Sequence, residues 1–244
     1  MWGRAGHLAL PALAFFAGFR EAAAMPISEH SLLLVIVFAY AAIIILLTTT
    51  WLSSGIEPFL RTWLAGTFVS LVGAFVSAVF YMKPALWAGA ISFGALAIGF
   101  GINALTSFQF RTNHLRLRLF GPVILAVAAA TVVAMLSGYV GLSIITWRAW
   151  AAVCGVAAAA NYWMARAEAP VALTILTLFY LALAIPFALS SGILILDGNM
   201  FAPRPDNWAD QASRLVALLV RLGSVAVLLM LSHWRAARRR AQPA

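Results

Sequence analysis

The sequence contains few charged residues, and most of the charge that it has is of one sign. Only 9% of its 244 residues are charged, with 16 Lys plus Arg against seven Asp plus Glu. A soluble domain is about a quarter charged, so this composition excludes an ordinary soluble globule. The net charge of +9 would indicate nucleic acid in a soluble protein. In an apolar chain it indicates basic cytoplasmic loops beside anionic lipid, and no nucleic-acid partner is expected.

The residues that usually carry chemistry inside membranes are also scarce. The one cysteine, Cys154, permits neither an internal disulfide nor a metal site built on thiolates. The one lysine, Lys83, follows an apolar run and cannot hold retinal within a bundle. No His, Asp or Glu lies inside an apolar run, which argues against haem, serine hydrolysis and proton-coupled transport. We therefore predict no catalytic site, no metal and no cofactor.

Long hydrophobic runs make up most of the chain, which is 64% apolar with a mean hydropathy of +0.97. A membrane-spanning helix needs roughly 20 predominantly apolar residues. The windows that fit, each bounded by charge, Pro or a polar cluster, are 32–51, 59–81, 84–106, 120–141, 147–164, 170–196 and 208–233. We predict an all-α integral membrane protein, a bundle of seven transmembrane helices within residues 25–234, followed by a basic cytoplasmic tail at 235–244.

Residues 1–24 precede the first window and have two interpretations. A basic start at Arg4, an apolar stretch and three alanines before Met25 resemble a secretory signal peptide. Pro11 interrupts that stretch, and Arg20 follows it, so an over-called start with translation from Met25 is an equal alternative. Neither interpretation adds a span.

The loops between the windows differ in charge, and the difference predicts the orientation. One set, with the tail, holds nine basic residues: Arg61, Arg111, Arg116, Arg118, Arg166, Arg235, Arg238, Arg239 and Arg240. The other set holds Lys83, Arg148, Arg204 and Arg214 beside three aspartates. Basic loops stay in the cytoplasm, which predicts a cytoplasmic C-terminus and an outside N-terminus. The connection 110–119 is then a topology determinant, with a grip on lipid phosphates as the alternative.

Small residues recur along one face of the second and third windows. Their spacing of three or four residues places them on one side of each helix, where small side chains let two helices approach closely in lipid. The candidate packing residues are Gly66, Ser70, Gly73, Ser77, Ser92 and Gly99. We predict a tight hairpin of these two helices, and the alternative is the seam of a homodimer.

Arg221 lies near the middle of the last window, with Arg214 seven residues earlier on the same helical face. Ionisable side chains at that depth are costly and usually face an interior cavity. Alternatively, the helix begins near Leu215 and Arg221 snorkels to the interface. Counting from the window ends places four polar residues at the level of Arg221: Tyr40, Ser70, Thr131 and Tyr180. These six are candidate ligand-binding residues for a small anionic or carbonyl-bearing amphiphile, unless each hydroxyl simply bonds its own helix.

The layout of spans and basic connections resembles a known family over residues 32 to about 240. Leu60, Arg61, Thr62, Trp63 and Leu64 open the second span, and the last span runs into His233, Trp234 and Arg235. This texture resembles the multi-span membrane input region that precedes the catalytic domain of bacterial diguanylate cyclases of the GGDEF class. The sequence departs from that family because no cyclase motif follows the last span, so cyclase activity is not carried over.

The resemblance implies a non-enzymatic sensor in a bacterial inner membrane, which signals through its last helix to a cytoplasmic partner. Two other classes compete with this interpretation. One is a small transporter or permease-like subunit that works as an oligomer. The other is a membrane scaffold or assembly protein whose second and third helices contact a partner.

Overall fold

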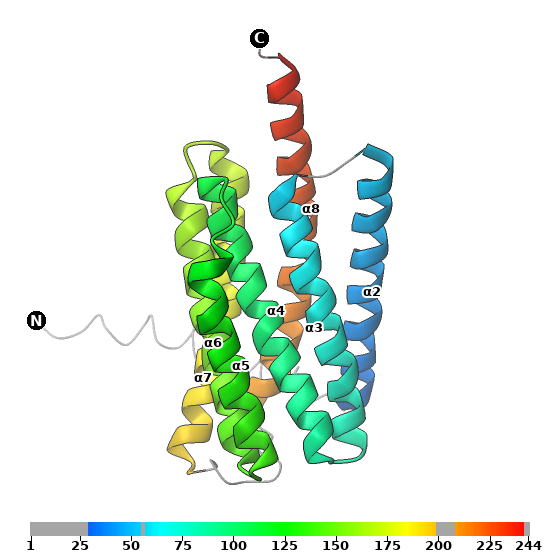
Figure 1. The fold of residues 1–244 in the computed structure, drawn as a ribbon, viewed down its shortest axis with the longest axis vertical. Helices are drawn as coiled ribbons and strands as arrows, with labels where there is room; N and C mark the ends of the chain where they lie inside the picture. Colours follow the sequence, from blue (N-terminus) through cyan, green and yellow to red (C-terminus); the bar gives the residue numbers. More distant parts are fainter. Residues whose placement is uncertain (1–28, 55–56, 199–207, 242–244) are drawn as a thin grey trace, which may run out of the picture.

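The computed structural model describes residues 29–54, 57–198 and 208–241, and within these ranges the chain forms seven α-helices and no strand. They are α2 (Glu29–Ser54), α3 (Pro58–Met82), α4 (Leu86–Thr112), α5 (Leu117–Leu136), α6 (Val140–Met164), α7 (Pro170–Leu196) and α8 (Trp208–Ala241). Successive helices run in opposite directions, and α8 projects beyond the bundle at the end that carries the C-terminus (Figure 1). The all-α bundle is confirmed, whereas the predicted segment 1–24 lies outside the described residues.

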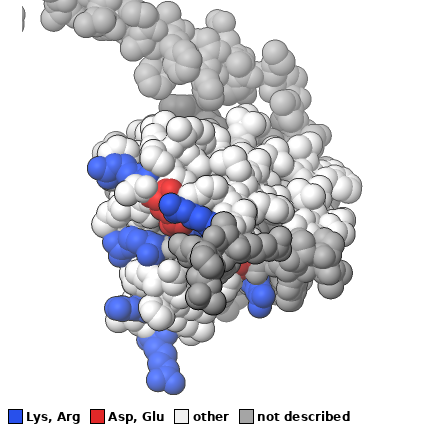
Figure 2. Space-filling model, turned by 90° about the horizontal axis from the view of Figure 1, so that it is seen from above, with Lys and Arg blue, Asp and Glu red and all other residues white. Residues whose placement is uncertain are grey.

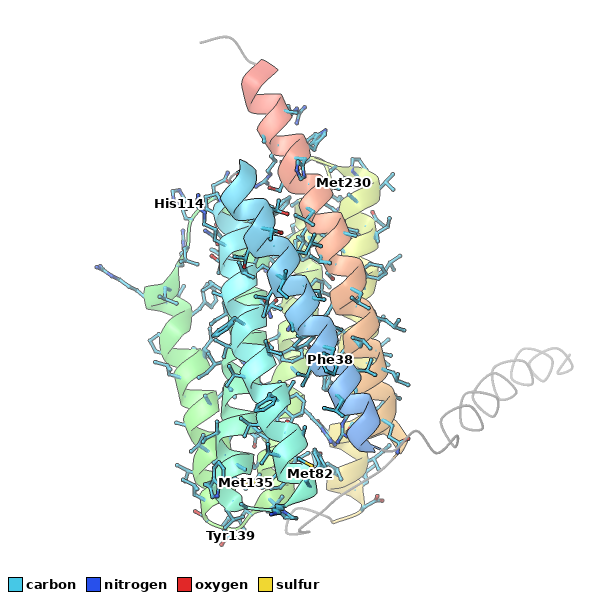
Figure 3. The ribbon with its side chains drawn as sticks, turned by 90° about the vertical axis from the view of Figure 1, so that its right-hand side faces the viewer. Phe38, Met82, His114, Met135, Tyr139 and Met230 are labelled. Atoms are coloured by element: carbon cyan, nitrogen blue, oxygen red, sulfur yellow. The ribbon has the colours of Figure 1, made fainter. Side chains whose placement is uncertain are left out.

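Most of the helices suit a membrane. Six of them, α3 to α8, are long and apolar enough to span one, while the apolar stretch described in α2, Leu34–Thr50, is shorter. Large apolar side chains also cover the outside of the bundle, as Phe38 shows at 71% exposure (Figure 3). Such a surface is stable only against lipid or another apolar partner. The chain is thus a multi-pass helical membrane protein, and a crossing by α2 stays a prediction.

The turn between α5 and α6 corrects two predicted windows, 120–141 and 147–164. Gly138 adopts a φ of 85°, and its N–H donates to the Met135 carbonyl at 3.0 Å. The N–H of Tyr139 donates to the Ala134 carbonyl at 2.9 Å. This pair of bonds with a left-handed glycine is the Schellman motif, which ends a helix. Hydropathy passes over this turn because glycine and tyrosine do not interrupt an apolar run.

The earlier start of α6 has a direct consequence for Arg148. The sequence prediction placed this residue at the outer interface, as the second residue of a span that begins at 147. In the structure α6 begins at Val140, and Arg148 is 1% exposed inside the bundle. At 1.5 Å per residue it lies about 12 Å along the helix. A cation assigned to the interface is therefore buried.

Part of the predicted basic tail is helical. Residues 235–241 continue α8 as far as Ala241, and residues 242–244 lie outside the described part of the chain. Arg235 is held against the bundle by Glu168 through a 2.6 Å ion pair, so the helix has a partner beyond its apolar stretch. Arg238 lies one turn further along the same helix and is exposed.

The antiparallel pair α3 and α4 packs backbone against backbone. The Ser77 and Ser92 hydroxyls are hydrogen-bonded to each other, and Ser92 also donates to the Gly73 carbonyl at 3.1 Å. A Cβ added to Gly99 would lie 2.8 Å from the Gly66 carbonyl oxygen. The six predicted packing residues thus lie in this hairpin, where they are buried within a single chain: Gly66, Ser70, Gly73, Ser77, Ser92 and Gly99.

We expect Gly99→Ala to lower the free energy of unfolding by about 1–3 kcal/mol, because the new methyl group forces two backbones apart. Gly192→Ala is the matched control, since a Cβ there meets nothing within 4 Å. That change should be neutral, or stabilising by roughly 0.5–1 kcal/mol through lower chain entropy in the unfolded state. Unfolding of the purified protein in mixed micelles measures both. Equal effects of the two substitutions would contradict the close approach.

Candidate functional site

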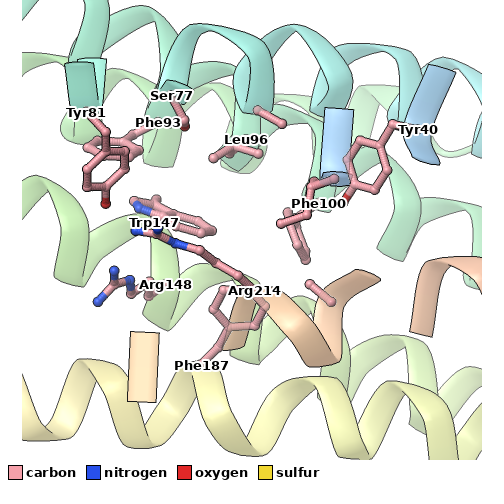
Figure 4. A pocket seen from close by; sticks show the side chains of 13 residues that line it. Tyr40, Ser77, Tyr81, Phe93, Leu96, Phe100, Trp147, Arg148, Phe187 and Arg214 are labelled. Carbon is pink, nitrogen blue, oxygen red and sulfur yellow. The ribbon is translucent and has the colours of Figure 1, made fainter. Parts of the chain in front are cut away.

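A cavity lies between the helices in the half of the bundle away from the C-terminal end. Its volume is about 60 Å³. The lining residues come from every helix except α5 (Figure 4): Ile36, Tyr40, Ala74, Ser77, Tyr81, Phe93, Leu96, Phe100, Trp147, Arg148, Phe187, Arg214 and Ala217. Apart from two arginines, two tyrosines and one serine, this lining is apolar, as is usual for small-molecule sites.

Two arginines supply positive charge to one end of the cavity. Arg148 on α6 donates from Nη1 to the Ser190 hydroxyl at 2.6 Å, and its guanidinium carbon lies 6.0 Å from the centroid of the Trp147 ring. The guanidinium of Arg214 on α8 stacks over the Tyr81 ring at 4.5 Å. Figure 4 shows both guanidinium groups toward the Tyr81 end of the cavity. Packed aromatic rings hold cations in place through their negative faces.

Aromatic rings form the rest of the cavity wall. Trp147 stacks on Phe93 with ring centroids 5.9 Å apart, and it meets Phe187 edge to face at 5.4 Å. Phe100 meets Phe187 edge to face at 5.5 Å. Such pairs stabilise one another beyond their burial, so the wall is held in shape before any ligand arrives. The cavity is therefore amphipathic, with two guanidinium groups at one end set among fixed aromatic faces.

Arg221 is buried in the middle of the bundle, with 3% of its surface exposed. It donates from Nη1 to the Thr67 hydroxyl at 3.3 Å and from Nη2 to the Ser70 hydroxyl at 3.4 Å. Because α8 begins at Trp208, Arg221 lies about 20 Å along the helix. The alternative in which the helix begins near Leu215 is not what the structure shows, and Arg221 does not snorkel to an interface.

An aromatic cage surrounds the Arg221 guanidinium. The ring centroids of Phe100, Tyr40 and Trp63 lie 5.2, 5.6 and 5.6 Å from its central carbon. Phe100 and Tyr40 also line the cavity. Arg221 thus contacts two rings of the cavity wall without lining the cavity itself, and its predicted role in ligand binding stays a prediction.

The other predicted site residues are divided by the structure. Ser70 and Tyr40 contact Arg221 directly. The Tyr180 hydroxyl accepts a hydrogen bond from Trp63 Nε1 at 3.2 Å, so Tyr180 is linked to Arg221 through the Trp63 ring. Thr131 is elsewhere, because it donates to the Val127 carbonyl at 2.9 Å on its own helix, α5. Among the described helices α5 contacts only α4 and α6, so equal depth did not bring Thr131 near Arg221.

Sequence reasoning missed Arg148 as an interior residue, and a local signal was present. Gly138 followed by Tyr139 between two apolar runs is a turn signature, and a helix that starts there places Arg148 two turns inside. Among the described residues, no group of three or more His, Cys, Asp and Glu side chains is arranged to hold a metal ion. Guanidinium groups and aromatic rings are prominent in the lining of the cavity.

The opposite end of the bundle carries an ion pair that ties α8 to its neighbours. Arg235 donates from Nε and Nη2 to the two carboxylate oxygens of Glu168 at 2.7 and 2.6 Å. Its Nη2 also donates to the Phe110 carbonyl at 3.0 Å, and the guanidinium lies 3.7 Å from the Phe110 ring centroid. Seen from this end, basic side chains surround a few acidic ones (Figure 2). The pair links α8 to both α4 and the turn before α7.

Comparisons of the chain with protein-family models, with curated proteins and with solved structures found no match. Its class is therefore defined by the fold and hydropathy described above, which are those of a multi-pass helical membrane protein.

Proposed function

We propose that this chain is a non-enzymatic sensor module of a bacterial inner membrane, which binds a small anionic amphiphile in the cavity. The observation that carries the proposal is the pair Arg148 and Arg214 at one end of an aromatic cavity. Guanidinium groups bind carboxylate and phosphate through paired, charge-assisted hydrogen bonds. The rings of Trp147, Phe100 and Phe187 would cover the apolar part of the ligand.

The proposed orientation puts the C-terminus in the cytoplasm and the N-terminus outside. It is supported by exposed basic residues at the C-terminal end, among them Arg111, Arg116 and Arg166, because cytoplasmic loops are enriched in such residues. In this orientation the cavity lies in the outer half of the membrane. The ligand would then come from the outer leaflet or from outside the cell.

A single helix joins the cavity to the opposite end of the bundle. Arg214 lines the cavity, and Arg235, which is 21 residues further along α8, holds Glu168. At 1.5 Å per residue the two positions are about 32 Å apart. A ligand that draws Arg214 toward itself would shift the equilibrium of the same rigid element at Arg235. A cytoplasmic signalling partner would bind residues 235–241 and respond to their displacement.

The test is a matched pair of probes that differ in charge alone. We expect propionate, whose size matches the cavity, to raise the melting temperature of the purified protein in neutral detergent, because binding to the folded state alone stabilises it. The uncharged propionamide, which has the same shape, should have a much smaller effect. An equal shift of the melting temperature with both compounds, or no shift with either, would contradict the proposal that the cavity binds an anionic ligand.

The transporter alternative has its own outcome in the same system. Uptake of propionate into proteoliposomes that depends on the protein would show that the chain is a transporter and not a sensor. A sensor should instead change the emission of a fluorophore at position 238 without any uptake. Arg238→Cys in a Cys154→Ala background allows a single label, because the chain has one native cysteine.

A further inference from the structure

A second, apolar crevice opens between α4, α5 and α6 in the half of the bundle near the C-terminal end. Its volume is about 300 Å³. It is lined by Gly101, Ala104, Leu105, Phe108 and their neighbours across α5 and α6. None of these residues lines the cavity of Arg148, so the crevice is a separate feature.

The crevice faces the hydrocarbon of the bilayer. Val123 on α5 and Val153 on α6 line it and are 49% and 57% exposed. Because both lie within spans of apolar side chains, their exposed surface contacts lipid tails and not water. A crevice of this kind accepts an acyl chain along its length.

Two arginines stand at the upper end of the crevice. Phe108 lines it, and the centroid of its ring lies 5.4 Å from the guanidinium carbon of Arg111 and 5.6 Å from that of Arg116. Both arginine side chains are exposed. Arg111 also places Nη1 2.9 Å from the Met164 sulfur, a weak acceptor, so its charge is not neutralised by that contact. Two cations and an apolar crevice thus share one aromatic ring.

We propose that this crevice is a binding site for an anionic phospholipid, with one acyl chain between α4, α5 and α6 and the phosphate between Arg111 and Arg116. Charge complementarity selects the lipid, because a zwitterionic headgroup gains less from two adjacent guanidinium groups. A soluble phosphate has no group to fill the crevice. The site does not depend on the ligand in the Arg148 cavity.

The test compares lipids with identical chains. We expect the protein in mild detergent to retain phosphatidylglycerol at least about tenfold more strongly than phosphatidylcholine in native mass spectrometry, given the attraction of each arginine for anionic lipid. Glycerol phosphate, the headgroup without chains, should not be retained. Equal retention of the two lipids, or retention of glycerol phosphate, would overturn the site.

Two variants separate the headgroup from the crevice. Arg111→Gln with Arg116→Gln should reduce retention of phosphatidylglycerol to that of phosphatidylcholine. The matched control, Arg61→Gln with Arg166→Gln, removes two exposed arginines from the same end and should retain the lipid. Ala157→Phe fills the crevice from α6 and should also abolish retention, with the melting temperature recording that the variant is folded. Undiminished retention of phosphatidylglycerol by the folded Ala157→Phe variant would overturn the acyl-chain site.

Discussion

Arg148→Gln should weaken the binding of propionate by roughly 30- to 150-fold. Truncating a charged partner costs about 2–3 kcal/mol, and each 1.4 kcal/mol is a factor of ten in Kd. The effect is expected at Arg148 because the Ser190 hydroxyl holds its guanidinium in the cavity wall. A preorganised group loses little entropy when a ligand binds. Titration calorimetry in detergent gives the Kd of both proteins.

Arg221→Gln is the matched control for this substitution. Arg221 and Arg148 are both buried, at 3% and 1% exposure, and the change removes the same charge. Arg221 lies behind the rings of Tyr40 and Phe100, so we expect its loss to alter the Kd by less than about fivefold, since it makes no direct contact. A greater loss of binding at Arg221 than at Arg148 would indicate that the ligand binds at Arg221, as the sequence predicted.

Arg235→Glu should lower the free energy of unfolding by about 2–4 kcal/mol. The substitution removes a two-fold charged contact with Glu168 and sets two carboxylates against each other in a partly buried position. It also removes the hydrogen bond to the Phe110 carbonyl. Unfolding in mixed micelles measures the loss. Limited proteolysis should show cleavage in α8 beyond residue 234 before the bundle opens.

The reciprocal exchange tests whether the pair itself is responsible. Arg235→Glu combined with Glu168→Arg should recover part of the stability, because the opposite charges face each other again. Recovery should be incomplete, because a glutamate at position 235 cannot donate the hydrogen bond that Arg235 gives to the Phe110 carbonyl. Arg238→Glu makes the same change at an exposed position one turn away and should cost little. A similar loss at Arg238 would mean that general charge at this end matters and the pair does not.

Hydropathy predicted the elements of this protein well where polar or conformational boundaries interrupt the apolar runs. The window 170–196 coincides with α7, whose limits are Pro170 and Leu196. Proline is suited to the first turn of a helix, and it marks the boundary in the sequence. The windows failed near Gly138 because a left-handed turn needs only a glycine and no polar residue. Because of this local failure, the sequence prediction did not place Arg148 in the bundle interior and did not include it among the candidate site residues.

The depth of a residue in the membrane could be counted from the sequence, whereas the neighbouring helix that its side chain faces could not. Arg221, Ser70 and Tyr40 were placed at one level and do meet in the structure. Thr131 was placed at the same level and lies on α5, which does not contact α8. Helical periodicity defines which residues share a face of one helix, but it does not say which helix that face meets.

The sequence by itself therefore determined that this chain is a helical membrane protein, where most of its helices begin, and which faces of α3 and α4 are small enough to touch. These properties follow from apolar length, charge and spacing along one chain. Only the tertiary structure decided that Arg148 and Arg214 share a cavity and that Arg221 lies against one of its rings without lining it. Those relations join helices that are distant in sequence, and side-chain packing in three dimensions alone selects such neighbours.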